Sequence, residues 1–309
     1  MLKHAIHLNK YEKRLSHNNF HEEYQYLNLI RDILEEGEIT SGRNGITKSV
    51  FGTSMHFSLE NNKIPIFTTK KVAYKTCLKE LLWFIKGDTN NNHLKEQKVN
   101  IWNGNSSTEF KKSIGLENLK DGDLGPIYGW NWRHFGASYI DCDTNYKDQG
   151  TDQLQNVINI LKDPKQRTSR RMIVTALDPS KVKEAVLPPC HVFFQFNVKN
   201  ENQLSCSVYC RSQDVALGQP FNVTSYAFLT HLIAKHCDLE ANEIILYAGN
   251  CHIYEEHIES MKEQIQRIPY QFPEIKITKK YESIEEYTLE DFEIENYSCH
   301  SKIKMDMIA

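Results

Sequence analysis

The residue best suited to covalent chemistry in this sequence is Cys190, which stands in the segment LPPCH. The two prolines before it restrict the backbone, and the alternating run at 192–198 predicts a strand after it. A thiol held at the entrance of a strand can act as a nucleophile, whereas free cysteines are more often simply buried. From this segment alone, a catalytic thiol and a structural cysteine are both open interpretations.

Three arginines lie beside predicted strands. Arg170 and Arg171 precede one strand, and Arg211 ends another. Guanidinium groups bind phosphate in a bidentate manner, and their positive field favours the thiolate form of a nearby cysteine. The pattern indicates a phosphate-bearing substrate beside an activated thiol, with a solvated basic surface as the alternative.

Glu80 interrupts an apolar helix predicted over residues 77–87. Burial disfavours the charged form of a carboxyl group, so its pKa should be raised, which suits a residue that relays protons. The alternative is that Glu80 emerges at the helix edge and is solvated.

Periodicity predicts the elements that position these residues. Apolar residues at helical spacing predict helices from 27, with Gly37 as a left-handed stop, and at 77–87, 154–161 behind the cap Asp152, 221–237 and 252–267. Strands are predicted at 55–59, 172–177, 192–198, 204–210, 243–247 and 275–277. The fold class is therefore α+β, with a single catalytic domain over 21–309 and a polar extension over 1–20.

Bulk composition excludes several classes of protein. With 40% hydrophobic residues, 25% charged residues and a net charge of −3, the chain has an ordinary globular balance that argues against a dedicated nucleic-acid partner. The eight cysteines contain no CxxC pair, so we expect reduced thiols and no metal site. Without an apolar segment of signal-peptide or membrane-spanning length, we expect no membrane association and a location in the cytoplasm or the nucleus.

Two local patterns are set aside. His252 and His257 are five residues apart and would face different sides of the predicted helix, so they do not form a zinc pair. Cys190 and His191 are adjacent in a strand and point to opposite faces, so they do not form a protease dyad.

Several motifs accompany LPPCH in a fixed order. They include YCRSQD (209–214), LGQPFN (217–222), HIY (252–254), ELLWFIKG (80–87), GDLGPIYGWNWRHFG (122–136), the Arg170–Arg171 pair and KMDMIA (304–309). Together they resemble the thymidylate synthase family from about residue 23 to Ala309. The resemblance implies a mixed β-sheet flanked by helices and a homodimer formed through that sheet.

The resemblance also implies an activity. Cys190 would add to C6 of the uracil ring of dUMP, which makes C5 a carbon nucleophile. 5,10-Methylenetetrahydrofolate would be consumed as donor of the one-carbon unit and the hydride, giving dTMP and dihydrofolate. The enzyme class is methyltransferase, with no metal required.

Roles carry over to matching positions. Catalytic roles fall on Cys190, Glu80, Tyr128, Arg211 and Asp214. The dUMP-binding positions are Arg43, Arg211, Ser212, Gln213, Asp214, Asn222, His252 and Tyr254, with Arg170 and Arg171 supplied by the partner subunit. The folate-binding positions are Trp102, Asp214, Leu217, Gly218, Phe221, Met307 and Ile308, for whose apolar members core packing is the alternative.

Asn222 bears on the choice of base, because a carboxamide can donate to uracil O4 and accept from N3–H. Related dCMP hydroxymethylases are expected to carry aspartate there, so Asn222 favours uracil over cytosine. It leaves open a pyrimidine hydroxymethylase, which would add water in place of hydride.

Several positions depart from the family pattern: Cys210 and Asn250 replace glutamine and aspartate, and Ala73 replaces an aromatic residue. Gly42, Asn103 and Leu177 are further departures. Cys210, Asn250 and Ala73 motivate a third alternative, a nucleotide- or RNA-binding relative without turnover.

Overall fold

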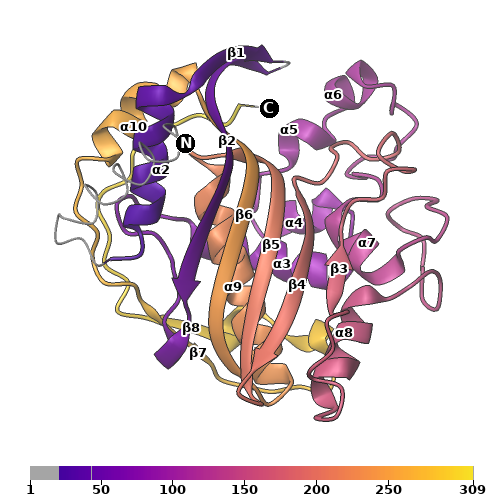
Figure 1. The fold of residues 1–309 in the computed structure, drawn as a ribbon. Coiled ribbons are helices and arrows are strands. Elements are labelled where there is room, and N and C mark those ends of the chain that lie inside the picture. The colour runs from indigo at the N-terminus through magenta and orange to yellow at the C-terminus, as the bar shows by residue number, and fades with distance from the viewer. Residues whose placement is uncertain (1–20, 43, 309) are drawn as a thin grey trace, which may run out of the picture.

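A computed structural model describes residues 21–42 and 44–308, and a mixed sheet forms its centre (Figure 1). Within these residues the sheet has six strands in the order β1-β2-β6-β5-β4-β3. The strands are β1 Glu38–Gly42, β2 Gly45–Ser58, β3 Ile173–Thr175, β4 His191–Lys199, β5 Gln203–Asp214 and β6 Glu240–Tyr254. All neighbours are antiparallel except β5 and β6, which are parallel and therefore need a crossover connection.

Helix α9, Gly218–His236, provides that crossover and lies behind β5 and β6 in Figure 1. It is apolar on nearly every side because it packs between the sheet and α3, Tyr74–Ile85. The remaining α-helices of the described residues are α2 Tyr24–Glu36, α4 Asn91–Glu96, α5 Asn103–Ser106, α6 Thr108–Ser113, α7 Tyr128–His134, α8 Gln153–Lys162 and α10 Ile258–Gln264. A small second sheet pairs β7, Glu274–Ile277, with β8, Phe292–Glu295.

The predicted mixed sheet with flanking helices is confirmed, and most predicted elements lie where expected. The cap at Asp152 is also confirmed, since its Oδ1 accepts from the backbone N–H of Gln155 at 2.9 Å. The prediction for Gly37 was wrong: α2 ends there, but Gly37 has a φ of −62°. Its missing side chain matters for space, because a Cβ would lie 2.5 Å from the carbonyl oxygen of Ile33.

The helix predicted over 252–267 was also wrong in its first part. His252 and Tyr254 are the last residues of β6, and α10 begins only at Ile258. Strand geometry prevails because β6 is paired on both sides, with β2 and with β5, as far as these residues. His252 lies in β6 and His257 lies just before α10, so the two histidines do not share the predicted helix.

One edge of the sheet gathers the segments of interest. The carboxyl ends of the parallel strands β5 and β6 meet there with the amino ends of β4 and β2, as the pairs Asp214–His252 and Thr47–Tyr254 show. The C-terminal tail ends near the same edge (Figure 1). Because these strands are set by one hydrogen-bonded ladder, side chains far apart in sequence are held close together.

Candidate active site

Cys190 lies just before β4, half-buried, and Arg211 holds its segment in place. The guanidinium donates to the carbonyl oxygens of Pro189 at 2.9 Å and Pro188 at 2.6 Å, and its Nη2 lies 3.8 Å from Cys190 Sγ. The backbone N–H of Arg211 also donates to the Cys190 carbonyl at 2.8 Å. The Arg211 guanidinium therefore fixes the segment that carries the thiol and also lies beside its sulfur.

A buried aromatic layer supports the nucleophile. Tyr128 OH accepts a hydrogen bond from the backbone N–H of Cys190 at 2.8 Å, and the Tyr128 ring stacks on His191 with centroids 4.1 Å apart. His191 Nδ1 is 2.7 Å from the hydroxyl of Tyr226. Burial lowers the pKa of His191 to about 3, so the ring is neutral and serves as packing and hydrogen-bonding support.

Sequence reasoning found Tyr128 through its motif but missed Tyr226 and the supporting role of His191. Tyr226 and His191 are 35 positions apart in the sequence, and no local pattern indicates such a contact. The dismissed dyad remains unsupported, because the His191 ring contacts the two tyrosines.

Glu80 is connected to this layer through Trp102. The indole N–H of Trp102 donates to Glu80 Oε1 at 2.7 Å, and the Trp102 ring lies 6.1 Å from that of Tyr128. Burial raises the pKa of Glu80 to about 7 even though the Trp102 hydrogen bond opposes the rise. A carboxyl group poised near neutrality can both accept and release a proton.

The alternation of buried and exposed side chains in β5 and β6 shifts by one residue at the site. In β6 the buried residues are even-numbered up to Ala248 and odd-numbered from Gly249 onward, and β5 changes similarly between Cys210 and Gln213. A Cβ on Gly249 would lie 2.9 Å from the carbonyl oxygen of Arg211, so only glycine allows this close approach. The change leaves the side chains beyond it half-buried at the sheet edge instead of in the core.

The half-buried residues beyond this shift are Ser212, Asp214, Asn250, His252 and Tyr254. His252 Nδ1 is 2.9 Å from Oδ1 of Asn250, so the departure at this position still orients the imidazole. Burial lowers the pKa of His252, against the opposing charge of Asp214.

His252 and Tyr254 line a cavity of about 200 Å³ together with the β1–β2 hairpin. Gly42 and Asn44 of that hairpin also line it. Arg43 falls between these two positions and lies outside the described residues. Its proposed phosphate contact therefore stays a prediction.

Asn222 emerges half-buried from the first turns of α9. Its Nδ2 donates to Oε1 of Gln213 at 3.2 Å, and Gln213 itself is only 1% exposed. The preceding residue, Phe221, accepts from Cys77 Sγ at 3.3 Å, which ties α9 to α3 one turn from Glu80. Gly218 begins α9, and a Cβ there would contact both Asp214 and Gln213 at 3.5 Å.

Other predicted residues lie apart from the nucleophile or nearer the surface. Arg170 and Arg171 are exposed, and the carbonyl of Arg170 accepts from the side chain of Gln195. Gln195 is five residues beyond Cys190 in β4, about 16 Å along the strand. Both arginines are therefore too far along the strand to join Cys190 within one chain.

The remaining predicted residues differ in their exposure. In the C-terminal tail, Met307 is exposed and Ile308 is half-buried. The imidazole Nε2 of His257 lies 2.8 Å from the backbone carbonyl oxygen of Asp306 and so holds this tail. Leu217 is half-buried at the start of α9, Cys210 is fully buried and Ala73 is exposed.

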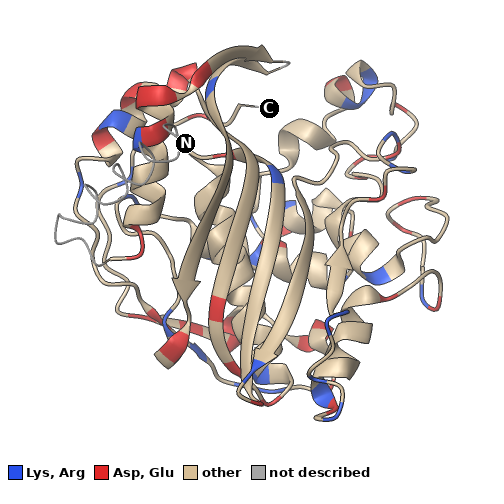
Figure 2. Ribbon diagram, viewed as in Figure 1, with Lys and Arg blue, Asp and Glu red and all other residues tan. Residues whose placement is uncertain are grey.

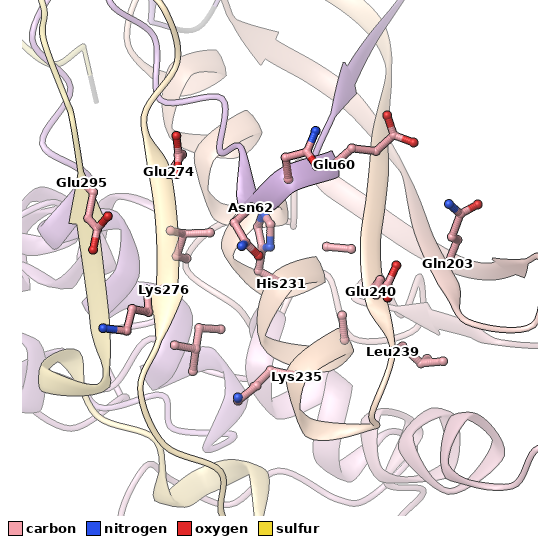
Figure 3. Close-up of a pocket in the computed structure, with 15 residues that line it drawn as sticks. Glu60, Asn62, Gln203, His231, Lys235, Leu239, Glu240, Glu274, Lys276 and Glu295 are labelled. Atoms are coloured by element: carbon pink, nitrogen blue, oxygen red, sulfur yellow. The ribbon is translucent and has the colours of Figure 1, made fainter.

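A cavity of about 870 Å³ lies elsewhere among the described residues. Figure 3 shows it between β7, the second half of α9 and the start of β6, with Glu60, Glu240 and Lys276 around it. None of the predicted site residues lines it, so it plays no part in the chemistry of Cys190.

Membrane-spanning helices and metal clusters are both absent from the described part of the chain. No helix there is long and apolar enough to cross a bilayer. Nor do three or more histidine, cysteine or acidic side chains converge there as metal ligands.

Comparison with known proteins adds independent information. Residues 24–309 match the family model described as thymidylate synthase. The thymidylate synthase of Saccharomyces cerevisiae is 46% identical over 296 residues, which cover 93% of this chain and 97% of the yeast protein.

Longer relatives match as well. A probable thymidylate synthase of Schizosaccharomyces pombe is 49% identical over 93% of this chain, and the chain spans 47% of it. A bifunctional dihydrofolate reductase-thymidylate synthase of Paramecium tetraurelia is 46% identical over 98% of this chain, which spans 65% of that protein. The chain thus spans about half to two thirds of these two longer relatives, and it belongs to the thymidylate synthase family.

Proposed function

We propose that this protein is a thymidylate synthase, which converts dUMP and 5,10-methylenetetrahydrofolate into dTMP and dihydrofolate. The observation that carries the proposal is the half-buried thiol of Cys190, 3.8 Å from the Arg211 guanidinium. The sulfur forms a bond to C6 of uracil, and the ring electrons move to O4 and activate C5. The family relationship and the named relatives support the same activity.

Glu80 serves as the proton relay in this proposal. With a pKa near 7, its carboxyl group can deliver a proton toward O4 as the thiolate adds, and can later return to its starting state. Tyr128 holds the Cys190 backbone and assists removal of the C5 proton through water. Asp214 contacts the pterin ring.

The nucleotide binds along the sheet edge. Arg211, Ser212 and Arg43 take the phosphate, and His252 and Tyr254 bind the deoxyribose hydroxyl from the small cavity that they line. Asn222 reads the base.

The cosubstrate lies against Trp102, Leu217, Gly218 and Phe221, with Met307 and Ile308 of the tail closing over it. It is consumed in each turnover, so no permanently bound cofactor or metal is needed. We place the protein in the cytoplasm or the nucleus, a proposal that fractionation of cells would test.

The active enzyme is a homodimer formed through the uncovered face of the sheet. Phe51 is 83% exposed there, and Ile173, Phe193 and Tyr247 are between 38 and 45% exposed on the neighbouring strands. Figure 2 shows the middle of these strands almost free of charged residues. A wide apolar face of this kind is typical of subunit interfaces.

In the dimer, Arg170 and Arg171 reach the phosphate in the partner's site. Mixing two inactive proteins, Cys190→Ala and the double variant Arg170→Ala/Arg171→Ala, should restore activity, because a heterodimer contains one site with neither defect. If the mixture stays inactive although subunits exchange, the shared site is wrong.

The activity is tested with pure protein, dUMP and methylenetetrahydrofolate, by following dihydrofolate absorbance. dCMP and Cys190→Ala serve as parallel controls. Dihydrofolate formed only from dUMP and only by the native protein supports the proposal. A hydroxymethylated product mass, or no product, would sink it.

A further inference from the structure

The cavity of about 870 Å³ in Figure 3 carries an excess of negative charge. Its charged lining consists of four glutamates and two lysines: Glu60, Glu240, Glu274, Glu295, Lys235 and Lys276. None of the four carboxylates forms an ion pair with another described residue. The cavity therefore attracts a cation at neutral pH.

One pair of these glutamates lies on neighbouring strands. Glu274 of β7 and Glu295 of β8 are directly opposite each other, where like charges are destabilising. Lys276 does not neutralise them, because its Nζ lies 3.3 Å from Oε2 of Glu293, its own partner across the strands. An ammonium group placed between Glu274 and Glu295 would remove their repulsion.

The second pair lies on another wall of the cavity. Glu60 begins the short 3-10 turn Glu60–Asn62, and Glu240 begins β6. The backbone N–H of Leu59 donates to the carbonyl of Asn242 at 2.8 Å, which joins these two segments. Figure 3 shows the two pairs of glutamates on opposite sides of the view, with His231 between them.

His231 presents a hydrogen-bond acceptor to the cavity. It is only 6% exposed, and its Nε2 lies 2.9 Å from the carbonyl oxygen of Lys63. A carbonyl oxygen can only accept, so Nε2 carries the proton and Nδ1 the lone pair. Burial lowers the pKa of His231 to about 4, so the ring is neutral at pH 7.

Nδ1 of His231 has no hydrogen-bond partner among the described residues and is accessible from the cavity. An acceptor in so buried a side chain favours a ligand that brings a donor to it. The ligand is not a metal ion, because histidine, cysteine and acidic side chains do not converge as ligands in the described part of the chain.

We propose that this cavity binds a linear aliphatic polyamine. A terminal ammonium group lies at each pair of glutamates, and a central amine donates its N–H to Nδ1 of His231. This site is separate from that of Cys190 and does not depend on the proposed activity.

Calorimetry on the full chain at pH 7 and low ionic strength tests the proposal, with spermidine as the probe. 1,8-Diaminooctane is the matched ligand: it has the same length and the same terminal amines, but a methylene group in place of the central amine. We expect spermidine to bind at least about fivefold more tightly, because only spermidine can donate to His231.

Two double variants locate the site. Glu274→Gln/Glu295→Gln removes the contacts of one terminal ammonium group, so spermidine affinity should fall by roughly 5- to 10-fold. Glu60→Gln/Glu240→Gln does the same at the other end. Glu35→Gln/Glu36→Gln removes equal charge from the exposed end of α2, outside the cavity, and should change affinity by less than about twofold. Thermal melting checks that all the variants fold.

No binding of spermidine by the native protein at millimolar concentration would overturn the proposal. Equal weakening by the cavity variants and by the α2 variant would also overturn it, because the attraction would then belong to the net charge of the protein. Equal affinities for spermidine and 1,8-diaminooctane would overturn the assignment of a central amine to His231.

Discussion

Glu80→Gln should stabilise this protein, and more at high pH than at low pH. Burial raises the pKa of Glu80 from the ordinary value of 4.5 to about 7 in the folded protein. A carboxyl group whose pKa is higher in the folded than in the unfolded protein favours folding while it is protonated. As pH rises from 4.5 to 7 the unfolded chain ionises first, so stability falls through this window and stays low above it.

The magnitude follows from the two pKa values. Each pH unit of difference corresponds to about 1.4 kcal/mol, so the ionised carboxylate costs up to roughly 3 kcal/mol at pH 8 and about 1 kcal/mol at pH 5. Glutamine has nearly the same shape, stays neutral and can still accept the indole N–H of Trp102. The gain in free energy of unfolding should therefore be about 2.5 kcal/mol larger at pH 8 than at pH 5.

Guanidinium denaturation at both pH values and one protein concentration measures this difference. Glu285→Gln is the matched control with the opposite sign. Burial would raise the pKa of Glu285, but hydrogen bonding from Ser283 and the charge of Arg133 together lower it. Its loss should destabilise the protein, and more at pH 8 than at acid pH.

An equal effect of Glu80→Gln at the two pH values would refute the reasoning. It would mean that Glu80 is solvated at the helix edge, the alternative that the sequence left open. Loss of turnover in a stabilised Glu80→Gln protein would instead agree with a catalytic group held in an unfavourable environment.

Three further predictions concern packing, capping and pH dependence. Gly129→Ala should lower stability by about 3 kcal/mol or more, because its Cβ would lie 2.2 Å from a carbonyl oxygen of α3; an unchanged melting temperature would contradict this. Asp152→Ala removes the α8 cap and the ion pair with Arg133, so unfolding should become easier by roughly 2 to 4 kcal/mol in denaturant titrations. Trp102→Phe removes the hydrogen bond that favours the charged form of Glu80, so the limb of the pH–rate profile near pH 7 should move up by about one pH unit. If the limb does not move, the titration that causes it belongs to another group.

Much of the fold could be predicted because its signals are local. The apolar circumference of α9 predicts a helix buried on all sides, and the alternation in β4 and β5 predicts paired strands. The end of β6 could not be predicted in this way. His252 and Tyr254 fit a helical pattern with the residues that follow, and only pairing on both edges of the strand decides otherwise.

By itself the sequence determined which reacting groups are present: a thiol before a strand, a carboxyl in an apolar helix, and a carboxamide at the start of another helix. Tertiary structure alone decided what those groups can do. It set Arg211 beside Cys190, tuned Glu80 through burial and Trp102, and placed Gln213 behind Asn222. The physical reason is that desolvation and hydrogen bonding depend on distance in space, whereas periodicity reports only on neighbours along the chain.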